Sequence, residues 1–218
     1  MSETDSFIEE VTEEVRRERL FRLIRRYGWI AALAIVLLVG GAAFNEYRKA
    51  QARAQAEAYG DALLAALETD GAGGRVTALE AIARPEDASS AVLDLLTAAQ
   101  MMAAEDPAGA GDILAALATN PDVAPVYRDL AGLKRVILLG DGLDASTRAA
   151  TLGALSQPGA PFRTLAQEQQ ALIFVEDGDP AAAIEIYETL INDAESPRDL
   201  IQRARQMIVV LGGELDAS

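Results

Sequence analysis

The sequence predicts an all-α protein with one N-terminal transmembrane helix and a following stack of helical hairpins. Three observations predict it. A single uncharged apolar run lies near the N-terminus, and from residue 75 onward alanine and leucine recur at helical spacing between Pro- and Gly-containing breaks. Two-residue alternation of apolar and polar residues is nowhere sustained, so no strand is predicted.

Residues 6–26 are predicted to form the first helix. Ser6 and Glu9 fit a capping box, and Phe7, Val11 and Val15 follow at four-residue spacing. Acidic residues come early and arginines late, as the helix dipole favours. We therefore expect a solvated, charged helix that continues into the apolar run.

The apolar run, Tyr27 to Asn45, holds 19 residues, which at a helical rise of ~1.5 Å per residue span about 28 Å. That length is close to the roughly 30 Å hydrocarbon core of a bilayer. Aromatic residues at both ends, Tyr27 and Trp29 against Phe44 and Tyr47, suit the headgroup level. A transmembrane helix is therefore predicted over residues 27–46.

Basic residues predict the orientation of this helix. The N-terminal flank carries six arginines, whereas only three basic residues follow the run closely. The positive-inside bias then places residues 1–26 in the cytoplasm and residues 47–218 on the exported side. The six are Arg16, Arg17, Arg19, Arg22, Arg25 and Arg26.

A cleaved signal peptide is the competing interpretation, because the small residues Gly41, Ala42 and Ala43 would suit a peptidase. A signal peptide has an apolar region of about 7 to 15 residues after a short basic start. Here the apolar run is longer and follows a 26-residue acidic-then-basic segment. The sequence therefore favours an uncleaved anchor.

After the apolar run, an alanine-rich helix is predicted over residues 46–69, and the glycines of 69–74 predict a loop. Further breaks then follow at intervals of about one helix. They are Arg84-Pro85, Asp106-Pro107, Asn120-Pro121, Gly140-Asp141-Gly142, Gln157-Pro158-Gly159, Gly178-Asp179-Pro180 and Ser196-Pro197.

An internal repeat is the second informative feature. Residues 105–117 align with 178–190 at an offset of 73, each copy with Asp at a predicted N-cap and Pro at the first helical position. Half of 73 is about 36, near the tetratricopeptide period of 34. A degenerate intervening copy is expected at 144–155. The residues expected to pack within the repeats are Ala110, Leu114, Leu117, Ala183, Tyr187 and Leu190.

Composition excludes several functional classes. The chain has no histidine and no cysteine, which removes Ser-His-Asp and Cys-His nucleophiles, common zinc sites and disulfides. From residue 54 onward, ten basic residues face 26 acidic ones, a net charge of −16, so nucleic acid is an unfavourable partner. Motifs for nucleotide or small-molecule binding are absent, so the sequence predicts no cofactor, no small-molecule substrate and no enzyme.

Three carboxylate groups are candidates for acid–base or cation sites: Glu105-Asp106, Asp141 with Asp144, and Glu176-Asp177-Asp179. All lie at predicted helix boundaries, where Asp and Glu cap amide groups and favour the helix dipole. Capping is the preferred interpretation, and an acidic-site hydrolase or metal enzyme is the alternative. Met101-Met102 is similarly assigned to ordinary core packing ahead of a promiscuous surface.

Taken together, the Arg-rich tail, the single span and the degenerate repeats resemble the ancillary SecYEG translocon subunit family of the YfgM type. The segment FIEEVTEEVRRERLFRLIRRYGWI, followed by Asn45 to Arg48, looks like an alphaproteobacterial member. The resemblance implies an inner-membrane protein with a periplasmic repeat domain, associated with translocon subunits and a membrane-anchored periplasmic chaperone. It implies no catalytic residues, and no peptide-binding residue can be transferred to this chain.

The leading functional hypothesis is a non-catalytic adaptor, because stacked helical pairs leave a concave face that binds protein segments. The alternative is a scaffold for envelope biogenesis or cell-division factors. Three segments are expected: a cytoplasmic tail over residues 1–26, a transmembrane helix over 27–46 and a periplasmic tetratricopeptide-like domain over 47–218.

Overall fold

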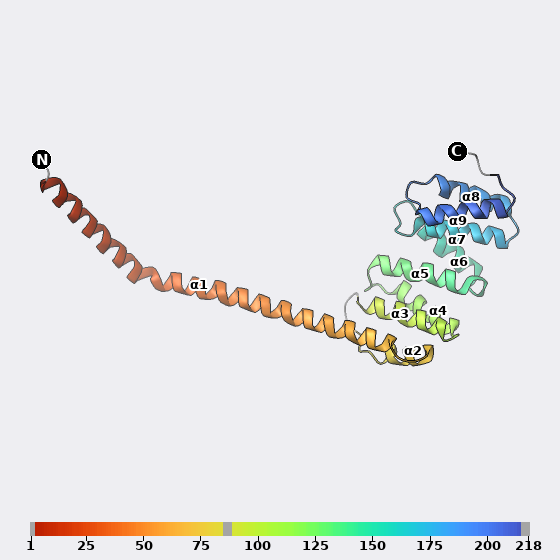
Figure 1. Ribbon diagram of the computed structural model, residues 1–218, viewed down its shortest axis with the longest axis horizontal. Coiled ribbons are helices and arrows are strands. Elements are labelled where there is room, and N and C mark those ends of the chain that lie inside the picture. Colours follow the sequence, from red (N-terminus) through yellow and green to blue (C-terminus); the bar gives the residue numbers. More distant parts are fainter. Residues whose placement is uncertain (1–2, 85–88, 215–218) are drawn as a thin grey trace. The chain divides into compact units, whose positions relative to one another are not determined.

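The computed structural model describes residues 3–84 and 89–214, and the side chains of 25–30, 33–84 and 90–214. Within these residues every regular element is helical and no strand is present, so the all-α prediction is confirmed (Figure 1). The helices are α1 (Glu3–Leu67), α2 (Ala72–Glu80), α3 (Ser89–Ala103), α4 (Pro107–Thr119), α5 (Pro125–Leu139), the short 3-10 helix η1 (Gly140–Gly142), α6 (Ala145–Leu155), α7 (Arg163–Glu176), α8 (Pro180–Asn192) and α9 (Arg198–Val210).

The chain divides into two units, one ending at Asp61 and one beginning at Ala62. Helix α1 carries the predicted tail, the apolar run and the alanine-rich segment in one continuous helix. Because α1 begins at Glu3, Ser6 lies inside it, and the expected cap at Ser6 is wrong. The side chains of Arg16, Arg17, Arg19 and Arg22 lie outside the part that the structure describes.

The loop predicted for residues 69–74 is shorter in the structure. Helix α2 already begins at Ala72, so Gly73 and Gly74 lie in its first turn. Gly71 alone takes the left-handed conformation, with φ of 74°, which glycine adopts without a steric penalty. Two helical glycines cost about 1 kcal/mol each, and complete burial of Leu79 on the same helix offsets that cost.

The helices of the second unit form two interleaved series. Helices α2, α4, α6 and α8 begin at residues 72, 107, 145 and 180, whereas α3, α5, α7 and α9 begin at 89, 125, 163 and 198. The period is therefore 35 to 38 residues, as the halved repeat predicts. Each helix from α2 to α9 packs against its neighbours in the chain, which produces the stacked arrangement of a solenoid (Figure 1).

The predicted breaks coincide with helix ends wherever the structure describes them. Arg84-Pro85 falls partly on residues 85–88, outside the described residues, and the other six separate consecutive helices from α3 to α9. The expected intervening copy is also present, because Asp144 caps α6 by accepting a hydrogen bond from the Thr147 amide at 2.9 Å.

The 73-residue offset holds in the backbone as well as in the sequence. Asp106 and Asp179 have nearly the same dihedral angles (φ −111° and ψ 72°, against −107° and 74°). Each caps its helix, accepting from the amide of Gly109 at 2.9 Å or Ala182 at 3.1 Å. The residue before each Asp, Glu105 or Gly178, is left-handed. Helices α4 and α5 therefore correspond to α8 and α9.

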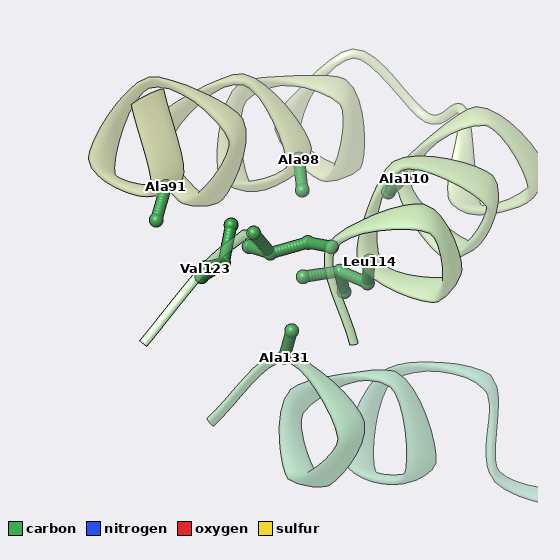
Figure 2. Close-up of a cluster of buried hydrophobic side chains, with 7 residues drawn as sticks. Ala91, Ala98, Ala110, Leu114, Val123 and Ala131 are labelled. Carbon is green, nitrogen blue, oxygen red and sulfur yellow. The ribbon is translucent and has the colours of Figure 1, made fainter. Parts of the chain in front are cut away.

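Three buried apolar clusters hold the second unit together. The first joins α3, α4 and α5 and consists of Ala91, Ala98, Ala110, Leu114, Leu117, Val123 and Ala131. The labelled side chains of this cluster point toward one another in Figure 2. The second joins α7, α8 and α9: Ala171, Ala183, Tyr187, Leu190, Leu200, Ala204 and Ile208. The third connects them through α6: Leu133, Val136, Leu143, Leu152, Leu155 and Ala166.

Candidate protein-binding surface

The six residues expected to pack within the repeats are all buried. Ala110, Leu114 and Leu117 lie in the first cluster, and Ala183, Tyr187 and Leu190 lie in the second. Met101 and Met102 pack against the first cluster and are partly buried. The six buried side chains are closed to a partner, so a binding surface must be built from other residues.

Five of the seven candidate carboxylates have structural partners among the described residues, and none is found for Glu105 or Asp177. Asp106, Asp144 and Asp179 are N-caps, which confirms the capping interpretation for these three. Hydrogen bonds from Ser146 and then from the Thr147 amide lower the pKa of Asp144. Asp141 and Glu176 instead both accept from Arg148. Within the described residues no group of His, Cys, Asp or Glu could hold a metal ion.

Ion pairs fix the positions of α7 and α9. Arg163, at the start of α7, donates to Asp193 at 2.6 Å and to Glu195 at 2.5 Å, in the segment between α8 and α9. The guanidinium group lowers the pKa of Asp193. Arg203 of α9 donates to Glu168 of α7 through both Nε and Nη2, at 2.8 and 2.9 Å. These pairs orient the last three helices, whose remaining surface is then available to a partner.

Large apolar side chains are exposed on three helices of the second unit beyond α2. They are Val126 and Ile137 on α5, Phe174 on α7, and Val209 and Val210 on α9. Ile137 and Val210 are 73 residues apart, and they are 54% and 76% exposed. The same repeat position thus presents an apolar side chain twice.

Several basic residues on α5 and α9 also lack an ion pair among the described residues. From residue 75 to the end, Arg84, Arg148, Arg163 and Arg203 form ion pairs, and Arg75 donates to Gln100. The other five form no ion pair with a described carboxylate, and all lie on α5 or α9: Arg128, Lys134, Arg135, Arg198 and Arg205. The sequence-based prediction missed them, although counting basic residues per repeat would have indicated both helices.

Helix α1 supplies the candidate membrane segment. The segment from Arg25 to Leu67 is long and apolar enough to cross a membrane. Its side chains from Leu33 to Val39 are exposed, as are Trp29, Phe44 and Tyr47. The Arg26 guanidinium carbon lies 5.8 Å from the centroid of the Tyr27 ring, within cation–π range. One described helix is therefore suited to a single membrane crossing.

Stacked helical pairs with exposed apolar and unpaired basic side chains define a helical-repeat protein of the interaction class. A family model described as a tetratricopeptide repeat-like domain matches residues 25–208, and the chain belongs to that family. The match includes the whole apolar run as well as the repeats. No curated protein and no solved structure matches the chain.

Proposed function

We propose that this protein is a membrane-anchored adaptor that binds other proteins without catalysis, accessory to the Sec translocon and to periplasmic chaperones. Residues 1–26 are cytoplasmic, residues 27–46 cross the inner membrane and residues 47–218 form a periplasmic domain. The observation that carries the proposal is the combination of one apolar helix with a tetratricopeptide repeat-like domain in a single chain.

Three features support protein binding as the activity. The family is built from helical repeats, which offer extended surfaces to protein segments. Exposed apolar side chains on α5, α7 and α9 supply area that association would remove from water. Five of the seven carboxylates considered for a hydrolytic site are engaged in caps or ion pairs instead.

The translocon and the chaperone are proposed as partners because residues 7–49 resemble the ancillary translocon subunits. An anchored repeat domain beside a translocon would meet exported chains as they emerge. The net charge of −16 beyond residue 53 also disfavours adhesion to anionic lipid, which leaves the domain free for protein partners.

The test is purification of the full-length protein from mildly solubilised native membranes and identification of the proteins that copurify. A matched variant carries an unrelated single-span anchor in place of residues 1–46. Translocon subunits and a periplasmic chaperone in the eluate are the expected result, and their loss with the replaced anchor would locate the contact in the tail or span. Recovery of division or envelope-assembly factors alone would overturn the translocon role and favour the scaffold.

A further inference from the structure

One side of α5 is covered by the next helix, α6, whereas the equivalent side of α9 is exposed. Gly132, Leu133 and Val136 on α5 are buried, and the last two lie in the cluster that includes Leu152 and Leu155 of α6. A Cβ atom at Gly132 would lie 3.3 Å from Thr151 Cγ2, so α6 approaches α5 closely there. A helix therefore covers this side of α5.

The equivalent positions on α9, 73 residues later, are Arg205, Gln206 and Val209. All three are exposed, and Val209 is 58% exposed. Gln202 lies one turn earlier on the same side of the helix, because residues at i, i+3, i+4 and i+7 share a face. We call Gln202, Arg205, Gln206 and Val209 the α9 outer face. No described helix covers it.

The charge of this face is opposite to that of the domain around it. Arg198, at i−4 from Gln202, and Arg205 continue one stripe toward Val209, and neither forms an ion pair with a described carboxylate. Beyond residue 53 the chain carries a net charge of −16. A cationic stripe beside an exposed valine selects a partner that is apolar and acidic.

We propose that the α9 outer face docks an amphipathic helix of a partner protein, with apolar residues against Val209 and a carboxylate against Arg205. Helix α6 on α5 is the internal precedent for such packing. A second copy pairing through the same face is disfavoured, because an isologous contact would bring the two cationic stripes together. The inference rests on the proposed protein-binding function and specifies the partner's chemistry.

The experiment uses the full-length protein in detergent micelles and two fluorescent synthetic peptides of about 18 residues, long enough to form a helix. Both peptides carry one leucine and alanine stripe, flanked by glutamates in one and by lysines in the other. Fluorescence anisotropy should show the glutamate peptide binding about tenfold more tightly, despite the acidic domain. Equal affinity, or tighter binding of the lysine peptide, would overturn the proposal.

Two charge-reversal variants locate the site. Arg205→Glu should abolish or invert the preference, because it changes the exposed cation on the α9 outer face. Arg53→Glu makes the same charge change at an exposed position on α1, outside the candidate surface, and should leave the preference intact. An equal effect of both variants would indicate bulk charge and overturn the assignment. Unchanged melting temperatures establish that both variants fold.

Sedimentation velocity tests the remaining alternative, in which a second copy of this chain occupies the α9 outer face. A dimer that dissociates on Arg205→Glu would assign the face to a second copy and overturn the partner proposal, whereas a monomer in both supports it. The two proposals are tested separately. If native proteins copurify with the wild-type chain but the glutamate peptide does not bind, the adaptor function stands and only the assignment of this face is wrong.

Discussion

Three buried polar side-chain atoms lack a hydrogen-bond partner among the described residues: Arg135 Nε, Tyr187 Oη and Ser196 Oγ. Burying such a group without a partner costs about 1 to 3 kcal/mol. The first copy of the repeat places Leu114 and Val123 where the second has Tyr187 and Ser196. The second copy therefore carries two polar groups at positions that the first fills with apolar side chains.

Replacing Ser196 by valine should raise the free energy of unfolding by about 1 kcal/mol, because it removes an unpaired hydroxyl and adds buried apolar surface. The measurement is denaturant unfolding of the full-length protein, followed by circular dichroism. Val123→Ser is the matched control at the equivalent position and should lower stability by about 1 to 3 kcal/mol. A loss of stability in Ser196→Val would show that the second site has no room for a methyl group.

The raised pKa of Tyr187 predicts that the protein loses stability at alkaline pH. Burial and, secondarily, the charge of Glu168 raise the pKa of Tyr187 from 10.0 to about 12. The folded state then holds a proton that the unfolded state releases, so stability is complete below pH 10 and falls as the pH rises toward 12. Each pKa unit between the folded and unfolded states corresponds to about 1.4 kcal/mol, so the free energy of unfolding falls by up to roughly 3 kcal/mol.

Tyr187→Phe should remove most of this pH dependence while leaving stability at pH 7 unchanged or slightly higher. Denaturant midpoints measured from pH 8 to pH 11.5 for both proteins test it, since the two proteins differ only at residue 187. Parallel profiles would contradict the assignment of the effect to Tyr187.

At the scale of the helix, the Asp-Pro start is the unit that the chain repeats. Asp106 and Asp179 cap α4 and α8 with the same geometry, and the residue before each Asp is left-handed. In the first copy that residue is Glu105, with φ of 62°, whereas the second has Gly178. This conformation costs a non-glycine residue about 1 to 2 kcal/mol. The turn between α3 and α4 is therefore more strained than the turn between α7 and α8.

Removing either cap should cost about 1 kcal/mol, because one helical amide loses its acceptor. Asp106→Ala and Asp179→Ala should give similar losses in denaturant unfolding, and the corresponding Asn variants should retain most of the stability. Asp112→Ala, an exposed position inside α4, is the control and should change stability by less than about 0.5 kcal/mol. Losses no larger than that of the control would contradict the capping role.

Relief of the strain at residue 105 is a separate prediction. Glu105→Gly should raise stability by about 0.5 to 1 kcal/mol, because the left-handed conformation becomes free of the Cβ penalty while the unfolded chain gains freedom. Gly178→Ala, at the matching position, should lower stability by about 1 kcal/mol. Unfolding midpoints test both, and destabilisation by Glu105→Gly would mean that the glutamate side chain makes a compensating contact.

At the scale of the whole molecule, one chain joins a helix suited to a membrane with an acidic repeat domain. The apolar run exposes its side chains from Leu33 to Val39, whereas the repeat domain buries leucines such as Leu114, Leu152 and Leu190 in its three clusters. Exposed apolar surface of this length is costly in water and favourable in a bilayer. The two parts of the chain therefore suit different solvents.

The proposed orientation is open to a direct test because the chain has no cysteine. A single cysteine at Ser6 should resist a membrane-impermeant maleimide in intact spheroplasts and react after lysis. A cysteine at Asn192, exposed on α8, should react in both. Labelling of residue 6 in intact spheroplasts would show that the orientation is the reverse of the one proposed. Loss of residue 6 from the mature protein would establish a cleaved signal peptide.

The sequence by itself determined the local features of this protein. Asp-Pro starts, the period of about 36 residues and the all-α content depend on neighbouring residues, so they could be predicted without a structure. Only the tertiary structure decided that α2 begins at Ala72 against the preference of its glycines, and which cations remain unpaired. Ion pairs such as Arg148 with Glu176 join residues 28 apart, and the partners of Arg203 lie up to 35 residues away. Such pairs form only when the helices stack, and the binding surface consists of what that stacking leaves uncovered.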